Sequence, residues 1–152
     1  MGALRGRRLG LALHWLTAVL VVAVAVASDP GTQRVLGGLL ALVGGAFVLR
    51  AVLVGALSPV TPRMRGWARA AHLGLHRGLL VALAGLIATG LPIGMAGPGV
   101  AEMVGPGDPW LALWHSRFFA LTFALAAGHL VFNIWRGAAL GERPFAAMLP
   151  KV

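Results

Sequence analysis

The stretch WLALWHSRFFALTFALAAGHLVFNIW, residues 110–135, decides the class of the fold. It exceeds the about 20 mostly apolar residues that a transmembrane helix needs, and Arg117 is its only charged residue. Three further runs have the same character, at residues 9–27, 35–57 and 70–95. The sequence therefore predicts an all-α integral membrane protein, a four-helix bundle with an up-down-up-down course.

The composition of the whole chain agrees with a membrane protein. Of its 152 residues 59% are hydrophobic and 11% charged, and the mean hydropathy is +0.85. An ordinary soluble domain carries about 25% charged residues. This excludes a basic disordered tail and makes a soluble nucleic-acid binder unlikely on physical grounds, since little polar surface remains. With no cysteine, disulfides, thiolate zinc sites and iron–sulfur sites are excluded too.

Turn-forming and helix-breaking residues separate the four runs. They lie at 28–31, 58–62, 97–99 and 105–109, and all four segments contain proline. Internal repeats and a separate soluble segment are not evident in the sequence. We therefore expect residues 1–152 to form one transmembrane domain, with membrane lipid as its first partner.

Charge predicts the orientation of the bundle, because cytoplasmic loops of membrane proteins are rich in Lys and Arg. With the N-terminus in the cytoplasm, the outer side keeps Arg34 and Arg117 together with three of the four acidic residues. The other 11 of the 13 basic residues then lie on or near the inner side: Arg5, Arg7, Arg8, Arg50, Arg63, Arg65, Arg69, Arg77, Arg136, Arg143 and Lys151. Both termini are therefore expected to be cytoplasmic.

The first run also has an alternative interpretation. Arg5, Arg7 and Arg8 precede an apolar segment that ends Ala25-Val26-Ala27-Ser28, which is typical of a cleaved signal peptide. The run is longer than the usual apolar region of such peptides, and it contains His14, which a discarded segment does not need. A retained first helix is the expected outcome.

Histidines occur in three of the four runs, and an ionisable residue within a span is a functional candidate. His14, His76 and His129 each lie about five or six residues from the inner end of their run, so three helices bring a histidine to one level. His115 lies near the outer end of the last run, and His72 at the inner mouth of the third. We expect His72 to be interfacial.

The spacing of the two histidines in the last run suggests a large flat ligand. His115 and His129 are 14 residues apart, which is about 21 Å along the axis and about 40° short of four full turns. Small residues, Thr122 and Ala126, lie between them on the same face. A proton relay favours carboxylate neighbours, which the runs lack, and zinc favours a third or fourth ligand. Two axial imidazoles on a haem fit best, and packed structural histidines are the alternative.

Short motifs in a fixed order support this chemistry along the whole chain. They are His14-Trp15, Arg50 before a proline-containing loop, Ala71-His72-Leu73-Gly74-Leu75-His76, Thr89-Gly90, Trp114-His115, His129 and Met148-Leu149-Pro150. In these features the chain resembles the bacterial cytochrome b561 family of four-helix membrane cytochromes. Its relatives include superoxide oxidase and the b-type cytochrome subunits of hydrogenases and formate dehydrogenases. The resemblance implies a multi-pass protein of the bacterial cell inner membrane.

The resemblance also implies a ligand set for two haems b. His129 and His14 would ligate the inner haem, and His115 the outer one. In the family the second outer ligand comes from the second helix, at a position equivalent to about Leu36, but that run contains no histidine. Four outcomes stay open for His115: a five-coordinate haem, a different second ligand such as Gln33 or Met103, a histidine from a partner subunit, or no haem.

Three further residues are candidates for the site, and their proposed roles depend on the family resemblance or on their depth in the membrane. Arg50 either extends its charge to the inner interface or pairs with a haem propionate near His14. His76 and Arg77 are candidates for binding a quinone head group, since the resemblance suggests quinone chemistry. A catalytic residue is not assigned.

The expected function is that of a membrane haem b electron-transfer protein, which exchanges electrons between haem and quinone. One version is a superoxide:quinone oxidoreductase. The first alternative is a membrane anchor and electron-conduit subunit of a dehydrogenase or hydrogenase complex, with a soluble dehydrogenase or a c-type cytochrome as its partner. The second alternative is a degenerate membrane scaffold without haem, which the missing histidine of the second helix favours.

Overall fold

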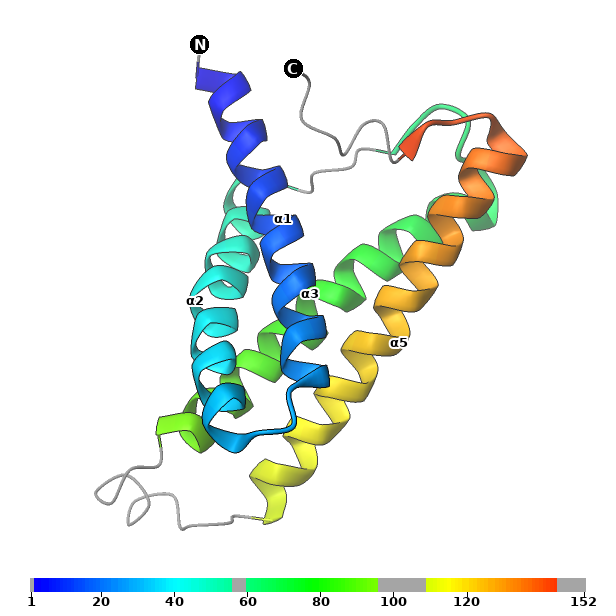
Figure 1. Cartoon of the computed structure of the whole chain (residues 1–152). Helices are drawn as coiled ribbons and strands as arrows, with labels where there is room; N and C mark the ends of the chain where they lie inside the picture. The colour runs from blue at the N-terminus through cyan, green and yellow to red at the C-terminus, as the bar shows by residue number, and fades with distance from the viewer. Residues whose placement is uncertain (1, 56–59, 96–108, 145–152) are drawn as a thin grey trace.

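The computed structural model describes residues 2–55, 60–95 and 109–144 (Figure 1). These residues form four helices and no strand: α1 (Gly2–Val26), α2 (Pro30–Val54), α3 (Gly66–Met95) and α5 (Pro109–Leu140). Each is long and apolar enough to cross a membrane. The predicted all-α four-helix membrane bundle is confirmed, whereas the predicted 97–99 turn and the Met148-Leu149-Pro150 motif lie outside the described residues.

The second helix begins earlier than predicted, at Pro30 instead of residue 35, because Asp29 caps it. The Asp29 carboxylate accepts hydrogen bonds from the backbone nitrogens of Gly31 (3.1 Å) and Thr32 (2.6 Å). Pro30 occupies the first helical turn, where its missing N–H costs nothing. The hydrogen bonds from Thr32 and Gly31 also lower the pKa of Asp29, since they favour the ionised carboxylate. The predicted 28–31 turn is therefore shorter than expected.

The third and fourth predicted helices also extend further than their apolar runs. α3 begins at Gly66 instead of residue 70, and α5 continues to Leu140 instead of residue 135. Glycines with positive φ mark these limits: Gly66 (φ 52°) opens α3 and Gly141 (φ 61°) follows α5. A left-handed conformation is one that glycine adopts at little cost, so both ends are fixed by backbone chemistry rather than by hydropathy.

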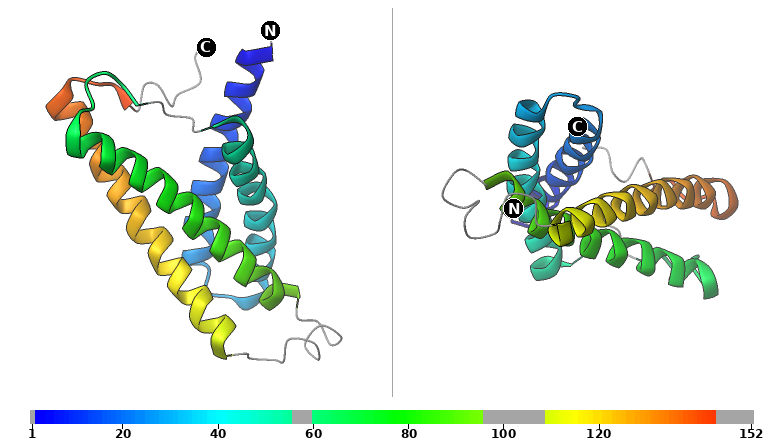
Figure 2. Two further views of the ribbon diagram at one scale, coloured as in Figure 1. Left: turned by 180° about the vertical axis from the view of Figure 1, so that it is seen from behind. Right: turned by 90° about the horizontal axis from the view of Figure 1, so that it is seen from below.

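The bundle has two distinguishable ends. We call the end at which α1 begins and α5 ends the proximal end, and the end with the α1–α2 turn the distal end (Figure 1). The helices alternate in direction, and α1 packs on α2, α2 on α3, and α3 on α5. Both views of Figure 2 show the α1–α2 pair and the α3–α5 pair crossing at an angle, and the pairs diverge toward the proximal end.

The apolar core of the described residues lies in the middle and distal part of the bundle. Its buried members are Val21 of α1, Leu40 of α2, and Leu83 and Leu86 of α3. Partly buried residues pack around them: Leu20, Val24, Phe47, Val48, Ile87, Phe118 and Phe119. Large apolar residues outside this core remain exposed, as at Leu42 (73%), which suits a surface that faces lipid.

Candidate functional site

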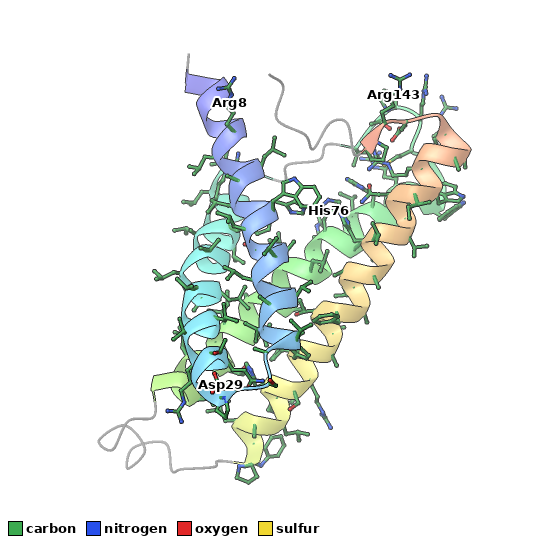
Figure 3. All side chains as sticks on the ribbon, viewed as in Figure 1. Arg8, Asp29, His76 and Arg143 are labelled. Atoms are coloured by element: carbon green, nitrogen blue, oxygen red, sulfur yellow. The ribbon has the colours of Figure 1, made fainter. Side chains whose placement is uncertain are left out.

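Polar side chains gather at the proximal end, along the seam between α3 and α5. Asn133 and Arg136 of α5 are each only 3% exposed, and His76 and His129 are partly buried. Figure 3 shows His76 on the stretch of α3 that lies between α1 and α5. Buried polar groups need partners, because an unpaired one costs free energy in an apolar environment. The contacts within this cluster therefore define the candidate site.

His72 belongs to this cluster and is buried in the bundle, which the sequence did not predict, while its depth at the membrane interface stays a prediction. It is 1% exposed, and its ring lies 4.2 Å from that of His76 and 6.2 Å from that of Phe132, centroid to centroid. The prediction counted depth from residue 70, but α3 starts at Gly66. α5 also covers this turn of α3, which depth alone does not reveal.

The predicted common level of His76 and His129 agrees with the structure. Their ring centroids are 4.7 Å apart in an edge-on arrangement between α3 and α5. The Nδ1 atom of His76 lies 2.8 Å from the backbone oxygen of His72. Because a carbonyl oxygen only accepts, we assign the His76 proton to Nδ1, which leaves a lone pair on Nε2. That nitrogen can ligate a metal or accept a hydrogen bond.

His14 approaches the same cluster from α1, in the other helix pair. It is close enough to His76 and His129 for its charge to interact with theirs. Its ring contacts those of Trp15 (5.6 Å) and Phe47 of α2 (5.7 Å). Three helices thus contribute histidines to one region, as the depth count predicts.

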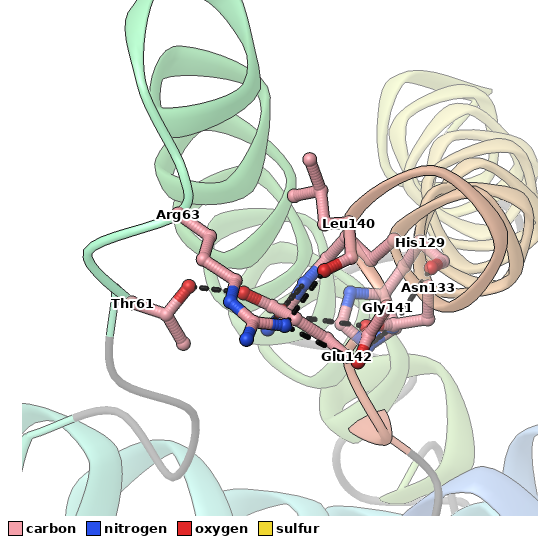
Figure 4. Close-up of polar contacts among 8 residues, drawn as sticks. Thr61, Arg63, His129, Asn133, Leu140, Gly141 and Glu142 are labelled. Atoms are coloured by element: carbon pink, nitrogen blue, oxygen red, sulfur yellow. Dashed lines mark hydrogen bonds and ion pairs between the residues drawn. The ribbon is translucent and has the colours of Figure 1, made fainter.

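A chain of hydrogen bonds continues from His129 toward the proximal surface (Figure 4). The side-chain nitrogen of Asn133 lies 2.9 Å from Nε2 of His129 and donates at the same distance to the His129 backbone oxygen. Arg136 donates to the Asn133 side-chain oxygen (3.3 Å). With Nε2 as acceptor, the His129 proton lies on Nδ1, a buried atom with no partner among the described residues.

Glu142 ends this chain, just beyond α5. Its carboxylate accepts hydrogen bonds from Nε (2.8 Å) and from a terminal nitrogen (2.5 Å) of Arg136, and from the Thr61 hydroxyl. Burial by itself raises the pKa of Glu142. The hydrogen bonds from Thr61 and Arg136, with the charges of Arg136 and Arg63, outweigh burial and lower that pKa overall. The pair is therefore ionised at neutral pH.

Sequence reasoning missed this network, although a signal for it exists. Asn133 and Arg136 follow His129 at the i+4 and i+7 positions, which places three polar residues on one face of an apolar helix. In the sequence analysis, Arg136 served only as one of the basic residues that predict the orientation of the bundle in the membrane. A polar stripe on a transmembrane helix indicates an interior face, and read in that way it would have identified both residues.

His115 occupies a different environment at the distal end. Its Nδ1 lies 3.1 Å from the Thr89 hydroxyl, which itself donates to the backbone oxygen of Gly85 (2.7 Å). Since the single hydroxyl proton is used there, Nδ1 of His115 donates and Nε2 keeps its lone pair. A Cβ at Gly90 would lie only 2.9 Å from the ring, so the ring packs closely on α3.

The partners considered for His115 are not brought to it by the described residues. The side-chain nitrogen of Gln33 donates to the Ala27 backbone oxygen (2.6 Å), across the α1–α2 turn. Leu36 is apolar, and Met103 lies outside the described residues. Its contact with Thr89 gives His115 a structural role that needs no metal.

The two arginines predicted near the site differ in their surroundings. Arg50 donates to the Gly6 backbone oxygen (3.2 Å) and so joins α2 to α1 at the proximal end. Arg77 is exposed, about 100° around α3 from His76. Arg50 thus lies within a helix-to-helix contact, whereas the structure does not bring Arg77 together with the histidine cluster.

The two ends of the bundle differ in how closely the helix pairs approach one another. Toward the distal end Phe118 fills the space beside Gly85, where even a Cβ would collide with its ring, and His115 fills the space beside Gly90. Toward the proximal end the helix pairs diverge (Figures 1 and 2). Nδ1 of His129 and Oγ1 of Thr17 are buried polar atoms without a hydrogen-bond partner in the described residues. Histidines from α1 and α5 at the proximal end are the residue types that could ligate a haem iron, whereas the side chains packed on Gly85 and Gly90 leave no such space beside His115.

Other metal sites have less support. Within residues 2–55, 60–95 and 109–144, no group of three or more His, Cys, Asp or Glu side chains is arranged to hold a metal ion. Axial ligation of haem iron needs only two imidazoles. The chain matches no protein-family model, no curated protein and no solved structure. The case for a function therefore rests on the geometry of the site.

Proposed function

We propose that this chain is a membrane haem b protein that exchanges electrons between one proximal haem and quinone. The observation that carries the proposal is the gathering of histidines from α1, α3 and α5, in which the rings of His76 and His129 touch and His14 lies within electrostatic reach of both. An intramembrane group of ionisable residues indicates function more often than packing.

His14 and His129 are the proposed axial ligands. Metal–imidazole bonds of about 2 Å on each side hold two opposed ligand rings more than about 6 Å apart, centroid to centroid. The His76 and His129 rings are 4.7 Å apart and edge-on, which leaves no space for iron between them. His14 lies on α1, in the opposite helix pair, within electrostatic reach of His129, and would supply the second ligand.

Iron binding requires Asn133 to release Nε2 of His129. The released amide keeps a partner, because it already donates to the His129 backbone oxygen (2.9 Å). A bound haem b supplies a one-electron Fe(III)/Fe(II) couple, and two protein ligands close the metal to oxygen. The chain contributes the low dielectric of the bundle around the two ligands.

His76 is the proposed quinone ligand. Its assigned tautomer presents Nε2, and its ring touches that of the proposed haem ligand His129. The lone pair on Nε2 could accept a hydrogen bond from the hydroxyl of the reduced quinone, which would lie a short distance from the ligand His129. The exposed position of Arg77 gives it a weaker claim to this role.

The proposal assigns one haem, so electrons enter and leave near the proximal side. A superoxide:quinone oxidoreductase that works across the bilayer needs a second, distal haem, for which Phe118 and His115 leave no room. The packing thus favours the version in which the chain is an electron conduit for a partner, such as a soluble dehydrogenase or a c-type cytochrome. We propose that this partner binds at the proximal face, which is the cytoplasmic face in the predicted orientation.

The haem content of the purified protein tests this proposal directly. We expect a reduced-minus-oxidised b-type spectrum with about one haem per chain, since one bis-histidine site is assigned. His14→Ala and His129→Ala should each abolish that spectrum. His115→Ala is the matched control on the same helix as His129, and it should retain the haem.

The possible results separate the alternatives. A protein without any b-type band would support the haem-free scaffold and refute the cytochrome proposal. A ratio of two haems, or loss of one haem in His115→Ala, would refute the single proximal site. Far-ultraviolet circular dichroism of each variant establishes that lost haem does not reflect lost helix.

A further inference from the structure

A groove runs along the α3–α5 seam near the proximal end, separate from the histidine cluster. It has a volume of about 550 Å³, and every residue that lines it is apolar. Trp67 and Trp135 stand at one end of it, with Phe132 beside them and Gly74 and Gly128 among the lining residues. This volume is within the range of about 300–1,000 Å³ that is usual for ligand sites. We call this feature the α3–α5 groove.

Missing side chains create the groove. A Cβ at Gly74 would meet nothing within 4 Å, so the backbone there faces open space. A Cβ at Gly128 would touch only Leu75, at 3.3 Å. Trp67 is 64% exposed and contacts Trp135 at 4.5 Å between ring centroids. Because both helices span the membrane, the groove opens to lipid, and an apolar group must fill it.

The proximal end of the same seam carries positive charge. Arg63 lies between the segment before α3 and the end of α5, and donates to the backbone oxygens of Leu140 (2.9 Å) and Gly141 (3.3 Å). Its side chain is exposed, as are the nearby basic residues Arg65, Arg69 and Arg143, the last of which is labelled in Figure 3. The neighbouring acid, Glu142, is already paired with Arg136. The charge at the groove's proximal end therefore suits an anion.

We propose that the α3–α5 groove binds an anionic phospholipid. An acyl chain lies over Gly74 and Gly128, the glycerol backbone lies level with Trp67 and Trp135, and Arg63 binds the phosphate. Paired tryptophans are typical of the membrane–water interface, which is the depth of a lipid's glycerol region. Guanidinium groups bind phosphate oxygens in a bidentate manner, and basic clusters beside transmembrane helices select anionic lipids.

The charge distinguishes this occupant from two others. A second copy of the chain, related by twofold symmetry, would bring an identical set of arginines to the same seam, and like charges would repel. A quinone carries no negative charge for Arg63 to bind. An anionic phospholipid satisfies both the apolar groove and the positive charge.

Quenching of tryptophan fluorescence by brominated lipid tests the proposal. The protein should carry Phe at Trp15, Trp110 and Trp114, so that Trp67 and Trp135 report. It is placed in phosphatidylcholine vesicles that contain an equal small fraction of brominated phosphatidylglycerol or of brominated phosphatidylcholine. We expect about fivefold stronger apparent binding of the anionic lipid, the preference that one arginine near the surface provides.

Two variants locate the lipid in the groove. Gly74→Leu fills the open space and should abolish the preferential quenching. Gly45→Leu is its control, because a Cβ at Gly45 on α2 also meets nothing within 4 Å but lies outside the groove. Arg63→Gln should reduce the anionic preference about fivefold, Arg63→Lys should retain most of it, and Arg34→Gln at the distal end should leave it unchanged.

Several results would overturn the proposal. Equal quenching by the two lipids in the parent protein would reveal only non-selective contact with the bilayer. Unchanged quenching in Gly74→Leu would place the lipid elsewhere. A change in the mass of the protein–detergent particle in Gly74→Leu would indicate a second copy in the groove. Quinone that co-purifies with the parent protein and is lost in Gly74→Leu, with no change in bound phospholipid, would indicate the third occupant.

Discussion

Replacing Glu142 by glutamine should destabilise the bundle at its proximal end. The side chains of Arg136 and Glu142 are 4% and 9% exposed, so this ion pair is shielded from water. Glutamine keeps the size of glutamate but has no charge and one acceptor oxygen instead of two, so its oxygen can accept from Arg136 while its amide nitrogen donates to the Thr61 hydroxyl. The substitution therefore isolates the electrostatic contribution of the pair.

The expected magnitude follows from this burial. Removing one partner of a buried ion pair usually costs about 3–5 kcal/mol, because the other charge is left uncompensated. The retained hydrogen bonds offset part of that cost, since a hydrogen bond to a charged group contributes about 1.5–3 kcal/mol. We therefore expect Glu142→Gln to lower the free energy of unfolding by about 2–3 kcal/mol at pH 7.

The effect should depend on pH in a defined direction. The pKa of Glu142 is lowered from its ordinary value of 4.5 in the folded protein. Its ionisation therefore stabilises the fold fully above pH 4.5, and this contribution is lost as the pH falls through the folded-state pKa. The difference in the free energy of unfolding between the parent and Glu142→Gln should be constant near neutral pH. It should decrease as the pH falls below 4.5.

Unfolding in mixed micelles of dodecyl sulfate and a mild detergent, followed by circular dichroism, measures these differences. Arg143→Gln is the control, because this exposed arginine should change stability by less than about 0.5 kcal/mol. A second control, Arg136→Met combined with Glu142→Gln, should recover much of the loss, since it removes the stranded charge. The reasoning would be refuted by a Glu142→Gln protein as stable as Arg143→Gln at pH 7.

Three further predictions follow from the packing and the charge pattern. Gly85→Ala should cost about 1–3 kcal/mol in the same unfolding assay, because the new Cβ collides with Phe118, whereas Gly94→Ala meets no atom within 4 Å and should be neutral or slightly stabilising; equal effects would contradict the contact. Asp29→Ala should speed amide hydrogen exchange at Thr32, which would lose its capping partner, and unchanged exchange would contradict the cap. Reporter fusions should find the C-terminus in the cytoplasm and a reporter inserted after Ser28 outside it, and the opposite pattern would contradict the predicted orientation.

Hydropathy predicted the helices well because each span is decided by its own residues. It did not predict the helix ends, which depend on capping hydrogen bonds and on backbone conformation. Asp29 and Pro30 start α2 through capping, and Gly141 ends α5 through its positive φ. Neither effect depends on hydropathy, so the apolar runs were shorter than the helices. The cap could have been recognised from the Asp-Pro pair, which is a usual helix start.

Helix rise predicted depth but not neighbours. The count from sequence brought His76 and His129 to one level, and their rings are in contact. It could not show that α5 packs on α3, so the contact of His115 with Thr89 and the burial of His72 were both unforeseen. Which face of a helix is buried depends on the helix that packs against it. A single sequence does not reveal which helices pair.

The contrast between the two ends of the bundle has a consequence for the proposed cofactor. In the middle and distal part, Val21 and Leu40 pack on Leu83 and Leu86, so the two helix pairs are held together by apolar contact. At the proximal end the pairs diverge (Figures 1 and 2), and His14 of α1 and His129 of α5 lie within electrostatic reach of each other. A ligand bound jointly by His14 and His129 would join the pairs where packing does not. Because it would bind the folded bundle and not the unfolded chain, such a ligand would stabilise the protein by mass action.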